Sequence, residues 1–473
     1  MGVSAVGLSI ASPLDAEAAI EPIHAAKEEE QILFVGDNIA VAETAYGKVR
    51  GVLYHGINQF LGIPYGADTF GKNRFMPAQK PEPWSETFQA LWWPNSAPQT
   101  RADARYNNKN SAFRDCWNYD AYSENCLGLN IWTQGIKDGK KRPVMFWIHG
   151  GGYTAGSSFE MTSYHGLNMA KRSDVVFVSV NHRIGALGYT NLAGFGGSKF
   201  AGSGNSSMTD LVFSLEWVRD NIANFGGDPN NVTIMGQSGG GSKVTTLLAM
   251  PSAKGLFHKA VALSGGSLRL GEKEASEKLG GYVLREAGLT ASQIDKLQAI
   301  PWEEYQELTA RATRKFNEEN NVATGQGGGG GGFRPVVDGT IIPQHPEAST
   351  ISSNVPFMIC STFNESSPTA YDSKLDAISL DGVKERLKDR YGANAGKVVD
   401  AYAAAFPAMK PSDIWSMALS TRTNAIAMAN NKAKQSQPVY LAWFGWQPPL
   451  FDGRSRAHHC VDIGFWFYNT DLM

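Results

Sequence analysis

The sequence predicts an α/β protein with a mostly parallel, doubly wound sheet, helices on both faces and an N-terminal antiparallel hairpin. From residue 143 onwards, short apolar runs typical of buried strands alternate with segments of helical periodicity. Such alternation indicates βαβ units, whose strands run parallel. Earlier in the chain, the β-rich runs 48–54 and 57–62 flank His55-Gly56, and a connection this short is typical of a hairpin.

The expected elements follow from apolar runs and their spacing. We expect strands over residues 143–148, 174–180, 232–235, 259–263, 356–360 and 438–446. We expect helices over residues 208–223, 242–250, 271–320 and 381–420. A run of six glycines, 327–332, fits either a slack surface linker or a mobile lid. In a sheet of this class, catalytic groups belong at the C-terminal ends of the strands.

Composition and charge exclude some function classes. The 473 residues include 43 basic and 45 acidic ones, for a net charge of −2, and no basic block stands out. We therefore expect no nucleic-acid partner. No apolar run reaches the length of a membrane span, so none is expected.

The first residues are typical of an export signal. Residues 2–14 are small and apolar, and Ala16-Glu17-Ala18 has the pattern of a cleavage site, although a basic n-region is missing. We expect residues 1–18 to be a signal remnant, with a disordered tail as the alternative, and residues 19–45 to be a linker. An exported protein, periplasmic or extracellular, follows from this interpretation, and its oligomeric state stays open.

The four cysteines do not indicate a metal site. They are Cys116, Cys126, Cys360 and Cys460, and none forms a C-x-x-C motif, so no zinc site is expected. Cys116 and Cys126 lie ten residues apart and either form a disulfide, as an exported protein permits, or remain free thiols. Cys360 ends an apolar strand and is expected to be buried.

The stretch Gly236-Gln237-Ser238-Gly239-Gly240 reads G-x-S-x-G and lies between an expected strand and an expected helix. This context is that of a nucleophile elbow, in which a serine occupies a strained turn. The glycines let the strand and the helix pass closely. The helix N-terminus also places backbone N–H groups where an oxyanion would form.

A second glycine-rich motif precedes the elbow. His149-Gly150-Gly151-Gly152 follows the apolar strand 143–148 directly. Consecutive glycines at the end of a strand allow backbone N–H groups to turn inward. This is the oxyanion loop that accompanies a nucleophile elbow.

A serine hydroxyl needs a base, and the base needs an acid to orient it. With a nucleophile elbow, the chain order is serine, acid, histidine. The histidines after Ser238 are His258, His345, His458 and His459. The first is too close to Ser238 and the second precedes the acid, which leaves the adjacent pair after the strand 438–446. Glu365 follows an apolar strand and is the candidate acid, whereas its competitor Asp338 lies in an Asp-Gly turn.

From about Tyr46 to its end, the chain resembles the type B carboxylesterases, the family that includes the cholinesterases. The resemblance rests on residues 60–65, 123–130, 149–153, 181–188, 224–231, 236–241, 333–339 and 364–365. It implies the α/β-hydrolase fold, with one domain over residues 46–473. Family members normally continue well beyond the histidine motif, so we expect a C-terminally truncated chain.

The resemblance also implies roles for individual residues. Ser238 would be the nucleophile, Glu365 the acid and His459 the base. The backbone N–H groups of Gly151, Gly152 and Gly239 would form the oxyanion hole. His459 is preferred to His458 because the family motif H-x-x-E-x-x-F-x-F is matched by His459, Asp462, Phe465 and Phe467. No metal or cofactor is implied.

Two positions beside the nucleophile depart from the family pattern. Gln237 stands where glutamate is usual, which should weaken a preference for cationic alcohols. Gly239 stands where alanine is common, a change expected to be harmless to its N–H donor. Cys126 matches a family half-cystine, but the usual partner position holds Ala97-Pro98-Gln99, so Cys116 would have to substitute.

The expected function is that of a serine carboxylesterase that hydrolyses neutral, small-molecule carboxylic esters through an acyl-enzyme. Aromatic walls are expected from residues 149–153, Phe159 and the Trp466-Phe467 region. The alternative is a catalytically silent binding module like the neuroligins of the same family. Such modules typically lack the serine, so the presence of Ser238, Glu365 and His459 argues against it.

Overall fold

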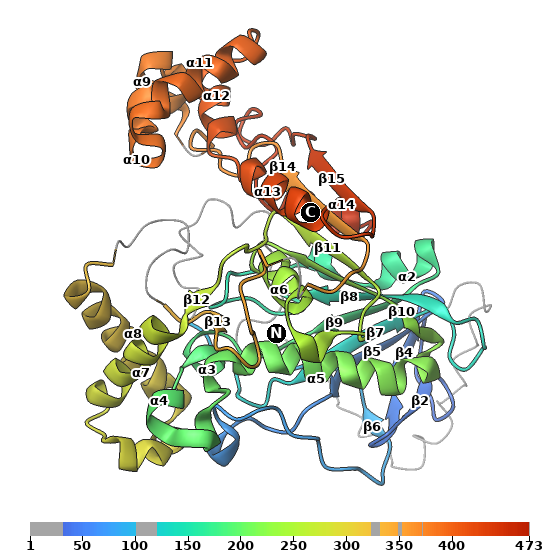
Figure 1. Cartoon of the computed structure of the whole chain (residues 1–473). Helices are drawn as coiled ribbons and strands as arrows, with labels where there is room; N and C mark the ends of the chain where they lie inside the picture. Colours follow the sequence, from blue (N-terminus) through green and yellow to red (C-terminus); the bar gives the residue numbers. More distant parts are fainter. Residues whose placement is uncertain (1–31, 101–120, 323–331, 349–351, 371, 473) are drawn as a thin grey trace, which may run out of the picture.

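The computed structural model describes residues 32–100, 121–322, 332–348, 352–370 and 372–472. Its centre is a ten-stranded sheet in the order β1-β4-β5-β7-β9-β8-β10-β11-β14-β15 (Figure 1). In this order, the strands are β1 (Leu33–Phe34), β4 (Val52–Tyr54), β5 (Ile57–Pro64), β7 (Gly128–Thr133), β9 (Val176–Val180), β8 (Arg142–Ile148), β10 (Gly227–Gln237), β11 (Lys259–Leu263), β14 (Phe357–Thr362) and β15 (Val439–Phe444).

The parallel part of the sheet runs from β9 to β15, as the alternating pattern predicted. The antiparallel part is larger than predicted, because β1 and β7 join the hairpin strands β4 and β5. The predicted hairpin is confirmed, with Tyr54 paired to Ile57. Its turn residues have positive φ angles of 49° at His55 and 76° at Gly56, as a two-residue hairpin turn requires.

A small second sheet corrects the expected boundary of the folded region. Strands β2 (Val41–Thr44), β3 (Gly47–Arg50) and β6 (Phe88–Gln89) form it, and β3 and β4 are separated at Gly51. The prediction of a linker over residues 19–45 is therefore wrong for β1 and β2. Turn residues such as Gly36 and Asn38 separate these short strands in the sequence, and they obscured the pattern.

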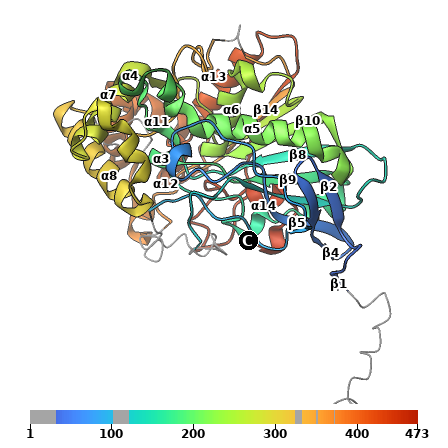
Figure 2. The ribbon, with the colours of Figure 1, turned by 90° about the horizontal axis from the view of Figure 1, so that it is seen from below.

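Helices cover both faces of the sheet, as predicted. The apolar side chains of β8 alternate, with Phe146 in the core on one face and Trp147 in the core on the other. The first face is covered by α5 (Ser206–Asn221), α6 (Gly239–Leu248) and α13 (Arg422–Lys432), and the second by α2 (Leu167–Ser173) and α14 (Ile463–Trp466). Figure 2 shows α5 and α6 on one side of the strands and α14 on the other. Burial on both faces explains why these strands are apolar throughout.

Two helical groups flank the sheet. Helices α7 (Lys273–Glu286) and α8 (Trp302–Glu319) pack on each other around a core of their own. Helices α9 (Leu380–Arg386), α10 (Lys388–Tyr391), α11 (Ala395–Ala405) and α12 (Pro411–Ala418) share another core and project from the body (Figure 1). The helical regions predicted at 271–320 and 381–420 are thus confirmed in outline. In the described residues, the remaining α-helices and strands are α3 (Gly185–Tyr189), α4 (Ala193–Gly196), β12 (Gly271–Glu272) and β13 (Val336–Val337).

Several predictions fall outside the described residues. These are the signal remnant, Cys116 and all of the six-glycine run except Gly332. Cys126 and Cys360 are free thiols, and Cys360 is buried as expected. Within the described ranges, no helix combines the length and apolar character needed to cross a membrane.

Candidate active site

Ser238 occupies a sharp turn between β10 and α6. Its backbone angles, φ 57° and ψ −122°, lie outside the usual regions for a non-glycine residue. A Cβ atom at Gly236 would lie 2.5 Å from the backbone of Gly240, and one at Gly240 would lie 2.1 Å from the Ile148 carbonyl oxygen. The glycines of the motif are therefore required by close backbone contacts, and the predicted strand–turn–helix geometry is confirmed.

The loop formed by residues 149–152 leaves the end of β8 and packs against the start of α6. Gly151 and Gly152 have positive φ angles of 78° and 64°. A Cβ atom at Gly239 would lie only 2.0 Å from the Gly152 carbonyl oxygen. Gly152 and Gly239 line the same cavity as Ser238, whereas Gly151 is not among its lining residues. Glycine at position 239 therefore allows this close approach of the loop to the helix, which an alanine side chain would obstruct.

Glu365 and His459 meet at the same edge of the sheet. Glu365 follows β14, His459 lies in the loop after β15, and His459 Nδ1 is 2.6 Å from Glu365 Oε2. The backbone N–H of Thr362 donates to Glu365 Oε1 at 2.9 Å. The Glu365 side chain is 5% exposed and that of His459 is 30% exposed. The carboxylate is thus held from two sides beneath the imidazole.

The two competing residues take other partners. Asp338 accepts a hydrogen bond from the Asn205 side chain at 3.0 Å and bonds within its own turn, to the N–H of Thr340. His458 Nδ1 lies 3.3 Å from the Arg456 carbonyl oxygen. The geometry therefore favours Glu365 and His459 over Asp338 and His458.

Glu365 and His459 favour each other's charged forms. Burial is the largest effect on Glu365 and favours its neutral acid, but the hydrogen bond and charge of His459, together with further hydrogen bonds such as that from the Thr362 N–H, lower the pKa of Glu365. Burial is also the largest effect on His459 and lowers its pKa, but Cys460 and Glu365 together raise that pKa well above its usual value. A proton arriving on His459 is thus stabilised by Glu365.

Ser238 and His459 are not joined in the structure. His459 Nε2 lies 3.2 Å from Gln237 Nε2, and Gln237 is buried. No hydrogen bond links the Ser238 side chain to His459, although both residues lie in the described part of the chain. The structure therefore brings His459 to Glu365 and to the neighbour of the serine, but not to the serine hydroxyl itself.

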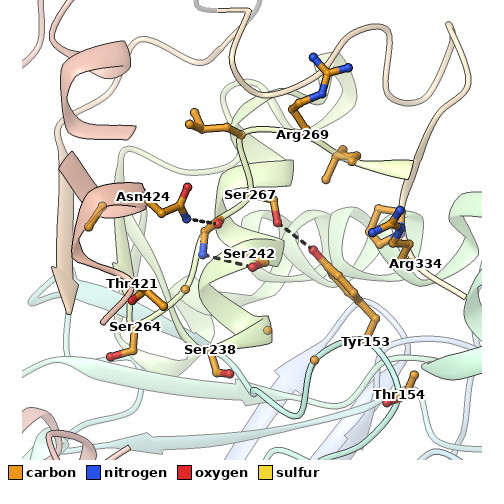
Figure 3. A pocket seen from close by; sticks show the side chains of 18 of the residues that line it. Tyr153, Thr154, Ser238, Ser242, Ser264, Ser267, Arg269, Arg334, Thr421 and Asn424 are labelled. Atoms are coloured by element: carbon orange, nitrogen blue, oxygen red, sulfur yellow. Dashed lines mark hydrogen bonds between the residues drawn. The ribbon is translucent and has the colours of Figure 1, made fainter. Parts of the chain in front are cut away.

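A cavity of about 800 Å³ opens in front of Ser238 (Figure 3). Tyr153 lies across it, with its hydroxyl 3.3 Å from Ser267 Oγ. Other lining residues are Ser242, Leu268, Arg269, Leu270, Phe333, Arg334, Thr421 and Asn424. No aspartate or glutamate is among the described residues that line it.

Most of the residues predicted to form aromatic walls do not line the cavity. Phe159 is buried and stacks on Trp93 with ring centroids 5.0 Å apart. Phe467 is buried against Trp147 on the second face of the sheet, and neither it nor Trp466 lines the cavity. Of residues 149–153, only Gly152 and Tyr153 face the cavity. Strand and helix periodicity does not tell which aromatic side chains turn toward a site and which complete the core.

Some residues of the site carry no motif that sequence reasoning could detect. Thr421 and Asn424 reach the cavity from the start of α13, and the Thr421 hydroxyl lies 3.4 Å from Glu365 Oε1. Lys243 is buried against the start of the loop of residues 149–152, and the one signal for it is a lysine within an otherwise uncharged helix. Within the described residues, no three His, Cys, Asp or Glu side chains gather into a group that could hold a metal ion.

Comparisons with known proteins match most of the chain. A model of the carboxylesterase family matches residues 38–471. The para-nitrobenzyl esterase of Bacillus subtilis is 32% identical over 438 residues, which cover 91% of this chain and 83% of that protein. Carboxylesterase 1E of Rattus norvegicus is 34% identical over 341 residues, which cover 68% of this chain and 58% of that protein.

Solved structures agree with these matches. An esterase from Clostridium hathewayi, described as able to hydrolyse aliphatic aromatic polyesters, superposes with a TM-score of 0.77 at 34% identity. The match covers 93% of this chain and 85% of that one. A para-nitrobenzyl esterase structure superposes with a TM-score of 0.72 at 29% identity, over 91% of this chain and 84% of that one.

Proposed function

Because the chain belongs to the carboxylesterase family and is a carboxylic ester hydrolase of the α/β-hydrolase fold, we propose that it works through an acyl-enzyme on Ser238. Ser238 is the nucleophile, His459 the general base and Glu365 the acid that orients it. The observation that carries this assignment is the 2.6 Å contact between His459 Nδ1 and Glu365 Oε2 at the edge of the sheet that bears the elbow.

The reaction follows from these positions. Ser238 Oγ attacks the ester carbonyl carbon while His459 Nε2 takes the hydroxyl proton. Backbone N–H groups of Gly151, Gly152 and Gly239 stabilise the resulting oxyanion. His459 then gives its proton to the leaving alcohol as the carbon–oxygen bond breaks. Water, deprotonated by His459, attacks the acyl group and releases the acid and Ser238.

The mechanism requires Ser238 Oγ and His459 Nε2 to come within hydrogen-bond distance during the reaction. In the structure, His459 Nε2 instead contacts the side-chain amide of Gln237. Catalytic hydrogen bonds are often long or misaligned in free enzymes and tighten when substrate binds. We propose that substrate binding moves His459 from Gln237 to Ser238.

The proposed substrates are neutral, moderately apolar esters. Tyr153, Leu268 and Phe333 give the cavity apolar surface, and no described carboxylate lines it to attract a cationic alcohol. The Bacillus relative is named for para-nitrobenzyl esters and the Clostridium relative for polyesters with aromatic units. We propose that this chain, too, accepts substrates with an aromatic group next to the ester bond.

A panel of p-nitrophenyl esters of graded chain length tests the proposal. Wild type should hydrolyse them, and Ser238→Ala and His459→Ala should lower kcat by at least about a thousandfold. His458→Ala is the matched control and should stay within about threefold of wild type, because that ring takes another partner. Activity of Ser238→Ala within tenfold of wild type would overturn the assignment, and loss only in His458→Ala would show that the base is the other histidine.

A further inference from the structure

Lys243 is a buried cation beneath the candidate site. It lies in α6, its side chain is fully buried, and its Nζ donates to the His149 carbonyl oxygen at 3.1 Å. None of the salt bridges among the described residues includes Lys243. An ammonium group without a paired carboxylate is costly to bury, so its contact with this carbonyl calls for an explanation.

The groups around Lys243 do not neutralise it. His149 and His182 stack with ring centroids 4.7 Å apart, and both are buried. Burial, and then the nearby charge of Lys243, lowers the pKa of both rings well below the usual value, so both are neutral. Burial lowers the pKa of Lys243 to about 7, and the charge of Glu160 opposes that shift. Of these three buried side chains, Lys243 is thus the one that still binds a proton near pH 7.

The position of Lys243 links two parts of the oxyanion site. His149 begins the loop that carries Gly151 and Gly152, while α6 begins at Gly239. Lys243 lies four residues after Gly239, about one helical turn, so its Nζ connects that helix to the start of the loop. The N–H donors from loop and helix must point at the same oxygen to within fractions of an ångström.

We propose that Lys243 is a positioning residue, which fixes the loop of residues 149–152 against the N-terminus of α6 so that the N–H groups of Gly152 and Gly239 converge on one oxyanion. The inference rests on the proposed function of Ser238. A side chain that merely filled space could be replaced by methionine, which has a similar length and no N–H donor.

Lys243→Met tests this inference, with Lys432→Met as the matched control. Lys432 is also buried, and its Nζ donates to the Ser353 carbonyl oxygen at 2.7 Å, but its hydrogen-bond partners do not lie in the loop of residues 149–152. The measurements are kcat and KM on a p-nitrophenyl ester, and the affinity for a trifluoromethyl ketone. Such a ketone forms a tetrahedral oxyanion on a serine and therefore reports the transition state.

The expected result is specific to the transition state. Lys243→Met should lower kcat and the ketone affinity together, by about tenfold to a hundredfold, with KM changed less than about twofold. Lys432→Met should change neither quantity by more than about twofold. Rates are expressed per active site by titration with an organophosphate, so that partial unfolding does not imitate a catalytic loss. Lys243→Gln keeps an N–H donor and should retain more kcat than Lys243→Met.

Two results would overturn the inference. One is wild-type kcat and ketone affinity in folded Lys243→Met. The other result applies even if Lys243→Met does not fold. It is a folded Lys243→Gln variant that has a lower kcat than wild type but the same ketone affinity. Failure of the proposed function looks different, because the ketone would then not bind the wild type or would bind Ser238→Ala equally well.

Discussion

Gln237 and His459 face each other through nitrogen atoms, with Nε2 of the amide 3.2 Å from Nε2 of the ring. When the ring is neutral, the contact of His459 Nδ1 with the Glu365 carboxylate places the proton on Nδ1 and leaves Nε2 to accept from the amide. Gln237 therefore contacts Nε2 of His459, the ring nitrogen that takes the Ser238 proton in the proposed mechanism. The residue before the proposed nucleophile thus contacts the proposed base.

Gln237→Glu should move the acidic limb of the pH profile of kcat/KM to higher pH. A carboxylate beside Nε2 stabilises the imidazolium and raises the pKa of His459, and the base works only when it is deprotonated. Gln237→Leu, which adds no charge, is the control and should leave the limb closer to that of wild type. Identical limbs in wild type and Gln237→Glu would show that position 237 does not face the base during catalysis.

Glu365→Gln should lower kcat strongly and move the acidic limb in the opposite direction. Glu365 raises the pKa of His459, so removing its charge lets the ring stay neutral to lower pH. An analogous change in a serine protease lowers kcat about 10⁴-fold because the imidazolium loses its stabilising partner. Glu365→Asp keeps the charge and should retain more activity. If Glu365→Gln left both kcat and the acidic limb of the pH profile unchanged, another residue would be the acid, and Asp338 would be tested next.

Gly239→Ala should slow catalysis without unfolding the protein. The added methyl group would lie 2.0 Å from the Gly152 carbonyl oxygen, so the loop must shift away from the helix. A displacement of about 1 Å in the oxyanion site should lower kcat by roughly tenfold to a hundredfold. Gly396→Ala in α11, where no atom lies within 4 Å of the added group, is the control for kcat and melting temperature. Wild-type kcat in Gly239→Ala would indicate that the loop adapts freely.

Phe467→Ala should destabilise the fold, and Phe465→Ala should do so much less. Phe467 is fully buried, with its ring 4.7 Å from Trp147 and 5.2 Å from Phe177, whereas Phe465 is 38% exposed. Removing a buried phenylalanine costs about 3–5 kcal/mol. The loss at an exposed position should be about 1 kcal/mol or less. The check is the free energy of unfolding from urea titration, and equal losses would contradict this account of the packing.

The local patterns of the chain were sufficient to predict the parallel strands and the elbow. β8 and β10 are apolar because they are buried on both faces, and glycine is needed at positions 236 and 240 because an added Cβ atom would lie 2.1–2.5 Å from neighbouring backbone atoms. Glu365 was selected from the sequence because it follows an apolar strand, and the structure places it beside His459. These features depend mainly on neighbouring residues, and such features are visible in a sequence.

Contacts between distant residues could not be predicted in the same way. The contact between Gln237 and His459 spans 222 positions, and the aromatic rings of Phe159 and Phe467 turned out to complete the core. A lysine such as Lys243 normally indicates a solvent-exposed helix face, so its burial was not expected. Strand β1 has two residues and gave no pattern to detect.

Covalent labelling tests the proposed role of Ser238 as the nucleophile. Wild type, Ser238→Ala and Ser242→Ala should each be treated with an organophosphate that carries a chromophoric leaving group, and the adduct located by peptide mass spectrometry. We expect one adduct per chain, on Ser238, formed in step with the loss of esterase activity. Ser242, which lines the same cavity, provides the control, and its alanine variant should be labelled like wild type. Inactivation with the adduct on another residue, or stoichiometric labelling of Ser238→Ala, would contradict the account.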